Sequence, residues 1–172
     1  MSIINISEEQ DINIMDLAEI KNFLRIDFDD DDNLLKELLK SAIRQCELYI
    51  SKSLYQKTYK FSTYKNVTNI LNLPYPPLIS ITSVNIIDIN NNSIEYINYT
   101  LDTISSSIIF KSLPNDFYRI DITYKSGYTQ LPNDIKQGLL FHISKMYEDK
   151  VGYSPIPKAS LNIYRNYRTI RI

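Results

Sequence analysis

The chain has 172 residues, of which 44% are hydrophobic and 23% charged, and its formal net charge at pH 7 is −1. This length and apolar content suit one ordinary folded domain with its own core and argue against a disordered chain. A net charge near zero excludes a protein that coats nucleic acid non-specifically, so any such contact needs a local basic patch.

The charged residues are divided between the two ends of the chain. Through Ser53 there are 12 Asp and Glu against 6 Lys and Arg, whereas after Asp149 there are five Lys and Arg and no acid. Such a molecule can meet copies of itself head to tail, or place its basic end against an anionic partner. The pattern indicates assembly before it indicates catalysis.

The sequence contains no typical leader or membrane segment. The start, MSIINISEEQD, lacks a basic region and already contains acids, and no run of about 18 apolar residues occurs. We expect a soluble protein that is made in the cytosol and has no membrane partner.

Cys46 is the only cysteine and His142 the only histidine. Intrachain disulfides and the usual Cys/His zinc sites are therefore excluded, and we expect no metal and no cofactor. A Cys–His dyad stays formally open. However, Cys46 follows Ala42 by four residues on an apolar helical stripe, so we interpret it as a small core residue. His142 lies between Phe141 and Ile143 in a helical segment, and we interpret it as a structural or surface histidine.

A first helix is predicted from Asp16 to about Leu24. Asp16 stands three residues before Glu19, which is the capping-box spacing that satisfies free N–H groups at a helix start. Apolar residues recur at helical spacing over this segment at Leu17, Ile20 and Leu24.

A run of aspartates, Asp27-Phe-Asp-Asp-Asp-Asp32, leads into a second helix from about Asn33 to Ser51. These acids suit the positive end of a helix dipole. The predicted buried face consists of Leu35, Leu38, Leu39, Ala42, Ile43, Cys46, Tyr49 and Ile50.

The aspartates also invite a calcium interpretation, because Asp27, Asp29 and Asp31 have the spacing of the first three EF-hand ligands. Position six of such a loop would be Asp32 instead of Gly, and position twelve would be Leu38 instead of a bidentate Glu. We favour a solvated helix cap over a calcium site.

From Tyr55 to Tyr124 the periodicity changes to two, and β-branched and aromatic residues become dense. Strands are expected at residues 55–64, 79–89, 94–99, 105–111 and 118–125, with a corner at Pro74, Pro76 and Pro77 and a hairpin turn at residues 90–93. Gly127 is expected to supply the turn that leaves this region.

A third helix is predicted from Leu131-Pro-Asn-Asp134 to about residue 149, and Val151 to Pro157 ends it. The remaining residues interleave bases with aromatic side chains. They form either an edge strand or docked tail with solvated arginines, or a contact surface for phosphate or an acidic partner. The candidate contact residues, for a protein partner or DNA, are Lys158, Tyr164, Arg165, Tyr167, Arg168 and Arg171.

We expect this tail to be extended, to be mobile or differently placed in the free subunit, and to become ordered when the particle is assembled. Its residues have enough apolar side chains to dock but too few to form a core alone, so docking would take place on a neighbour.

Several short segments, taken in order, match a known family. They are Leu17-Ala-Glu-Ile-Lys-Asn-Phe-Leu-Arg-Ile26, Leu34-Leu35 after the acidic run, Ser41-Ala-Ile-Arg-Gln-Cys-Glu-Leu-Tyr49, Leu73-Pro-Tyr-Pro-Pro-Leu-Ile79, Ile122-Thr-Tyr-Lys-Ser-Gly-Tyr128, Leu131-Pro132, Lys145-Met-Tyr-Glu148 and Tyr164-Arg-Asn-Tyr-Arg168. With this order, nearly the whole chain resembles the head-tail connector (adaptor, or head-completion) family of long-tailed bacteriophages and gene transfer agents.

The resemblance implies an α+β fold in a single connector domain over residues 1–172. A small helical domain (14–52 and 131–150) would carry an inserted antiparallel β segment (55–126) and an extended C-terminal tail (151–172). The family is structural, so no catalytic residue is carried over.

The implied function is a subunit of a ring, dodecameric when assembled, that lies beneath the portal of a tailed phage or prophage-derived particle and joins the DNA-filled head to the tail. Its partners would be further copies of itself, the portal protein, a tail-side connector or stopper protein and the DNA in the channel. It would reside at the head-tail junction of the virion, and in the bacterial cytoplasm during assembly.

Two other function classes stay open. A small nucleic-acid-binding module could use the Tyr/Arg-rich tail for stacking and phosphate contact, although residues 54–149, with 8 acids and 8 bases, supply no wider basic face. A hydrolase would have to rest on carboxylates such as Asp27 to Asp32, without a glycine-rich phosphate loop or a P-loop lysine motif.

Overall fold

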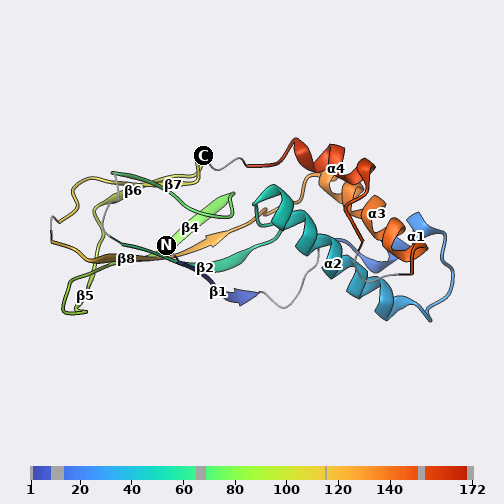
Figure 1. Cartoon of the computed structure of the whole chain (residues 1–172), viewed down its shortest axis with the longest axis horizontal. Coiled ribbons are helices and arrows are strands. Elements are labelled where there is room, and N and C mark those ends of the chain that lie inside the picture. The colour runs from blue at the N-terminus through green and yellow to red at the C-terminus, as the bar shows by residue number, and fades with distance from the viewer. Residues whose placement is uncertain (1, 9–13, 65–68, 115, 151–153, 170–172) are drawn as a thin grey trace. The chain divides into compact units, whose positions relative to one another are not determined.

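A computed structural model of the chain describes residues 2–8, 14–64, 69–114, 116–150 and 154–169. The chain forms two compact units, which we term the β unit (Met1–Gln10 and Tyr55–Thr129) and the helical unit (Asp11–Leu54 and Gln130–Ile172). Helices and antiparallel sheets are both present, which confirms the predicted α+β class (Figure 1). Across the described ranges, no helix is long and apolar enough to cross a bilayer.

The β unit contains two antiparallel sheets with strand orders β1-β2-β8-β4-β5 and β3-β7-β6. The strands are β1 (Ser2–Glu8), β2 (Lys57–Tyr64), β3 (Ile70–Asn72), β4 (Leu78–Ile87), β5 (Ser93–Glu95), β6 (Tyr99–Asp102), β7 (Ser107–Phe110) and β8 (Arg119–Ser126). The five strand regions expected from the alternating pattern are all present. Strands β1 and β3 were not predicted, and the segment expected at 94–99 is divided between β5 and β6.

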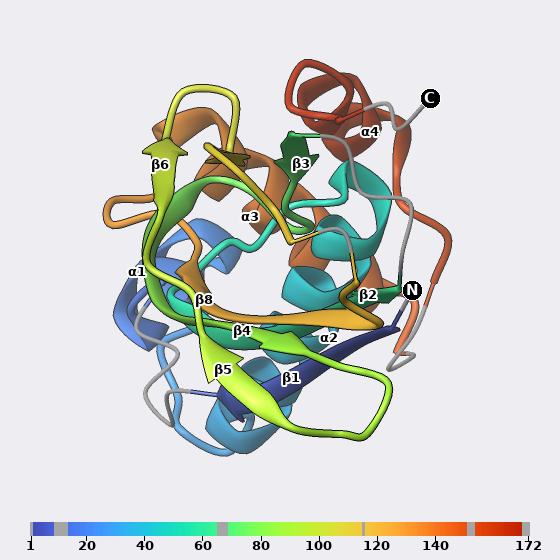
Figure 2. The same cartoon turned by 90° about the vertical axis from the view of Figure 1, so that its left-hand side faces the viewer.

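The core of the β unit draws on both sheets. Alternation along β2 buries Tyr59 and Phe61, and the central strand β8 buries Ile122. Ile108 and Phe110 of the smaller sheet belong to the same cluster. Figure 2 shows β3 and β6 over the layer formed by β4 and β8.

The predicted corner and turns are present, each held by identifiable hydrogen bonds. Tyr124 donates its hydroxyl hydrogen to the Pro74 carbonyl at 2.8 Å, and Ser126 Oγ donates to that of Pro77 at 2.8 Å. Gly127 has φ +132°, and a Cβ there would lie 2.0 Å from the carbonyl oxygen of Tyr55, so no other residue fits. In the hairpin between β4 and β5, Asp88 Oδ1 accepts the N–H of Asn92 at 2.8 Å.

The helical unit contains α1 (Leu17–Leu24), α2 (Asp32–Ile50), α3 (Asn133–Glu148) and α4 (Lys158–Arg165). Helix α2 buries seven of the eight residues expected on its apolar face, and Tyr49 is half-buried. Phe23 of α1 meets Phe141 of α3 edge to face at 5.9 Å between ring centroids. The predicted packing of the first three helices on one another is therefore confirmed.

Asp16 is the N-cap of α1 as expected, but the capping-box hydrogen bonds are not formed. The side chains of Asp16 and Glu19 are both exposed, and the Asp16 carbonyl accepts the Glu19 N–H at 3.0 Å. Water can satisfy the free N–H groups at this exposed helix start, so the carboxylates are not required there.

The C-terminal segment corrects the expectation of an extended, mobile tail. Residues 158–165 form α4, which packs on α3 and α2 within the same subunit. Ser160 Oγ donates to the Gly138 carbonyl at 2.8 Å, and Tyr164, one turn later, is fully buried. A Cβ at residue 138 would lie 2.6 Å from the Tyr164 ring, so Gly138 makes room for this ring in the middle of α3.

Candidate assembly surface

The basic residues predicted for partner contact lie around α4. Lys158 and Arg165 are exposed, and their positions are seven apart in the sequence, so they project from the same side of the helix about two turns apart. Arg168 is also exposed and lies over the Tyr49 ring, 5.2 Å from its centroid. Arg171 lies outside the described residues.

The aromatic residues of the same segment hold α4 in place. Tyr164 is fully buried and therefore belongs to the core of the subunit, not to its contact surface. Tyr167 is half-buried, and its hydroxyl donates to Asp134 at 3.4 Å. The Thr169 N–H donates to the Ile50 carbonyl at 2.9 Å, which ties the chain after α4 to the end of α2.

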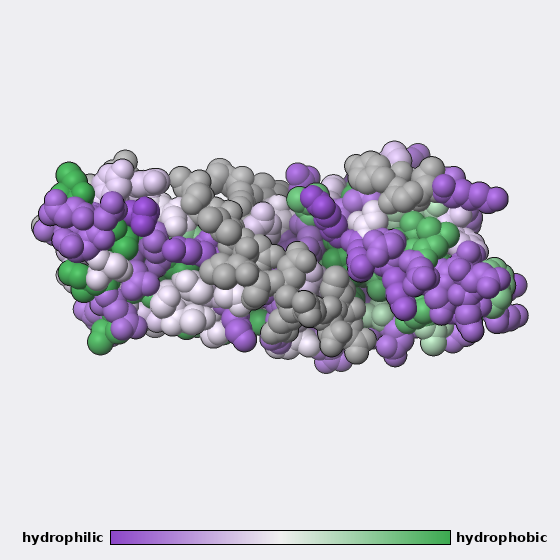
Figure 3. All heavy atoms as spheres, turned by 90° about the horizontal axis from the view of Figure 1, so that it is seen from below, coloured by the Kyte–Doolittle hydropathy of each residue, from purple (hydrophilic) through white to green (hydrophobic). Residues whose placement is uncertain are grey.

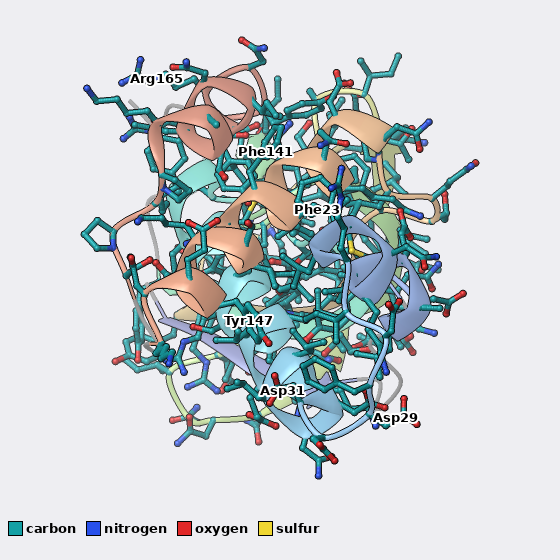
Figure 4. The ribbon with its side chains drawn as sticks, turned by 90° about the vertical axis from the view of Figure 1, so that its right-hand side faces the viewer. Phe23, Asp29, Asp31, Phe141, Tyr147 and Arg165 are labelled. Atoms are coloured by element: carbon teal, nitrogen blue, oxygen red, sulfur yellow. The ribbon has the colours of Figure 1, made fainter. Side chains whose placement is uncertain are left out.

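The aspartate run forms a fixed loop between α1 and α2. Lys21 Nζ lies 2.5 Å from Asp29 and 2.8 Å from Asp32, and Tyr147 of α3 donates its hydroxyl hydrogen to Asp31 at 2.5 Å. The bridge from Lys21 lowers the pKa of Asp29. Figure 4 shows Asp29 and Asp31 at the lower edge of the helical unit, Arg165 at its upper edge and Tyr147 between them.

Two exposed aspartates of the loop, Asp27 and Asp30, form no ion pair with any described residue. Phe28 stands between them with 49% of its surface exposed, and it was not among the residues predicted from the sequence to contact a partner. The sequence signal for Phe28 was a single aromatic residue within a run of acids, because a solvated helix cap does not require an aromatic side chain. As for metals, the described residues hold no group of three or more His, Cys, Asp or Glu placed to bind one.

Cys46 and His142 do not have the environments that a catalytic Cys–His dyad requires. Burial raises the pKa of the Cys46 thiol, and burial lowers the pKa of His142 to about 4. A nucleophilic cysteine needs a lowered thiol pKa, so these residues support the structural interpretation.

Large hydrophobic side chains are exposed on both units, and Figure 3 shows such residues scattered among hydrophilic ones. On the helical unit they are Phe23, Phe28, Leu34 and Leu48, and on the β unit Tyr64, Ile70, Ile89, Ile94, Ile97, Ile104 and Tyr118. Ile89, Ile97 and Ile104 are each more than four-fifths exposed.

A family model described as "Head completion protein" matches residues 13–154, which is most of the chain. The chain belongs to the head completion protein family. The match spans α1, α2, α3 and the strands from β2 to β8, so both units are part of this head completion protein's family region.

Three solved structures each contain a chain with the same fold as this head completion protein. Each match covers 100% of this chain and 97% of the matched chain. They are the neck of an empty GTA particle computed with C6 symmetry (TM-score 0.79, 18% identity), the virion of a native gene transfer agent particle (0.77, 19%) and the neck of a native GTA particle computed with C12 symmetry (0.74, 19%). No curated protein sequence matches the chain.

Proposed function

We propose that the chain is a structural head-tail connector (adaptor) subunit, which forms a ring beneath the portal of a tailed phage or prophage-derived particle and joins the DNA-filled head to the tail. The family match over residues 13–154 carries this proposal. The fold is shared with proteins from two GTA neck structures and one GTA virion, which supports this proposal. The two neck structures were computed with C6 and C12 symmetry, as is expected for assemblies built from rings.

The proposed partners are further copies of the chain, the portal protein, a tail-side connector or stopper protein and the DNA in the channel. The ring would be dodecameric. Both units would act as one connector domain over residues 1–172, located at the virion head-tail junction after assembly in the bacterial cytoplasm.

The surface chemistry supports assembly more than catalysis. Exposed isoleucines and tyrosines on the β unit and an exposed phenylalanine in the acidic loop can be buried by neighbours. The single cysteine and the single histidine are both buried in the helical unit, and burial raises the pKa of the Cys46 thiol, which opposes formation of a nucleophilic thiolate. No enzymatic role is proposed.

Co-purification with the portal protein of the same genome tests this function. The tagged portal is expected to retain the chain through size-exclusion chromatography as one large complex, in a fixed ratio of subunits. If the chain elutes alone at both low and moderate salt, the adaptor function is wrong.

A further inference from the structure

The exposed face of α4 has the charge that the α1–α2 loop of another subunit would attract. Lys158 and Arg165 lie on this face, and neither forms an ion pair within the described part of the chain. Arg168 extends the positive charge to the end of α2. Solvated surface cations need no partner for stability. However, cationic side chains aligned along one helix form a positively charged surface that attracts carboxylates of a partner.

The acidic loop is held by contacts within the subunit. Lys21 and Tyr147 bind Asp29, Asp31 and Asp32 within the subunit, whereas the exposed Asp27 and Asp30 form no ion pair with any described residue. Phe28, half-exposed between these two, offers an apolar contact at the centre of the charged surface. The loop therefore combines a central aromatic residue with a polar rim, as protein interfaces do.

The two surfaces lie on opposite sides of one helical unit, as the positions of Arg165 and Asp29 in Figure 4 show. A subunit whose complementary surfaces face in opposite directions cannot pair them internally. It can pair them with two neighbours, and such heterologous contacts close into a ring or continue as a filament.

We propose that the α4 face (Lys158, Arg165 and Arg168) of one subunit docks on the acidic loop (Asp27, Phe28 and Asp30) of a second copy of this chain. This contact rests on the proposed function, because it supplies the subunit-to-subunit interface of the connector ring. The charges steer and orient the encounter, and Phe28 becomes buried.

Charge exchange between the two surfaces tests the contact. We would prepare Lys158→Glu with Arg165→Glu, Asp27→Lys with Asp30→Lys, and the chain that carries all four changes. Ring formation with the portal would be measured by electron microscopy and native mass spectrometry. Each two-residue variant is expected to lose at least tenfold in the fraction of subunits in rings, and the four-residue variant to recover it.

A mixture of the two-residue variants gives a sharper result. One variant has acids on both surfaces and the other has bases on both, so neither pairs with itself but each pairs with the other. Equal amounts are expected to form rings in which the two variants alternate. The control is Glu95→Lys with Lys125→Glu, which reverses two exposed charges of the β unit and is expected to assemble as the wild type does.

The outcomes separate this contact from the function it rests on. If the wild-type chain forms no ring with the portal, the adaptor function itself is wrong. If the wild type and both two-residue variants form rings equally well, the function stands and this contact is wrong. If the variants fail but neither the mixture nor the four-residue chain recovers, α4 binds another partner, such as DNA, and the contact is again wrong.

Discussion

Leu38 lies in the middle of α2 with 1% of its surface exposed. Truncation to Ala leaves a cavity between helices, so Leu38→Ala is expected to lower the free energy of unfolding by about 2–5 kcal/mol. Urea denaturation followed by circular dichroism measures this loss.

Leu48 on the same helix is the matched control, because it is 67% exposed. Leu48→Ala is expected to change the free energy of unfolding by less than about 0.5 kcal/mol. A similar small change for Leu38→Ala would contradict the packing of α2.

His142 makes the stability of the helical unit depend on pH. Burial lowers its pKa to about 4 in the folded protein, whereas it is about 6.5 in an unfolded chain. Between these values the unfolded state binds more protons, so stability is highest above pH 6.5 and is lost as the pH falls toward 4. The full loss from this residue is about 3 kcal/mol.

The comparison of wild type with His142→Gln isolates this effect from the carboxylates. Urea denaturation at pH 7 and pH 5 is expected to give a loss on acidification that is about 2 kcal/mol smaller in the variant. Equal losses in the two proteins would show that His142 is not buried in its neutral form.

At the scale of elements, the main correction concerns α4. The apolar stripes of α1 to α3 and the alternation of β2, β4 and β8 are local patterns, and they predicted those elements well. Helix α4 has only eight residues, and its buried face rests on Ser160 and Tyr164. The space for Tyr164 comes from Gly138, more than twenty residues earlier, so no local pattern revealed it.

Removal of α4 is therefore expected to destabilise the subunit. Deletion of residues 158–172 uncovers Gly138 of α3 and Cys46 of α2. Tyr164→Ala alone is expected to cost about 3–5 kcal/mol. Thermal unfolding followed by circular dichroism measures both. A deletion variant with an unchanged midpoint would restore the view of a detached tail.

At the scale of the whole molecule, the division of charge along the sequence predicted assembly, and the family supports that interpretation. The basic residues at the C-terminal end could be read from the sequence, but the burial of Tyr164, which was predicted to be a contact residue, could not. Which aspartates are free could not be predicted either, because their partners Lys21 and Tyr147 come from two other helices.

The central claim is that this chain forms a connector ring on a portal. Electron microscopy of the purified portal with and without the chain tests it most directly. One additional ring is expected on the tail-side face of the portal, into which the two units fit with α4 at the boundary between neighbouring subunits. A portal that looks the same with and without the chain would contradict it.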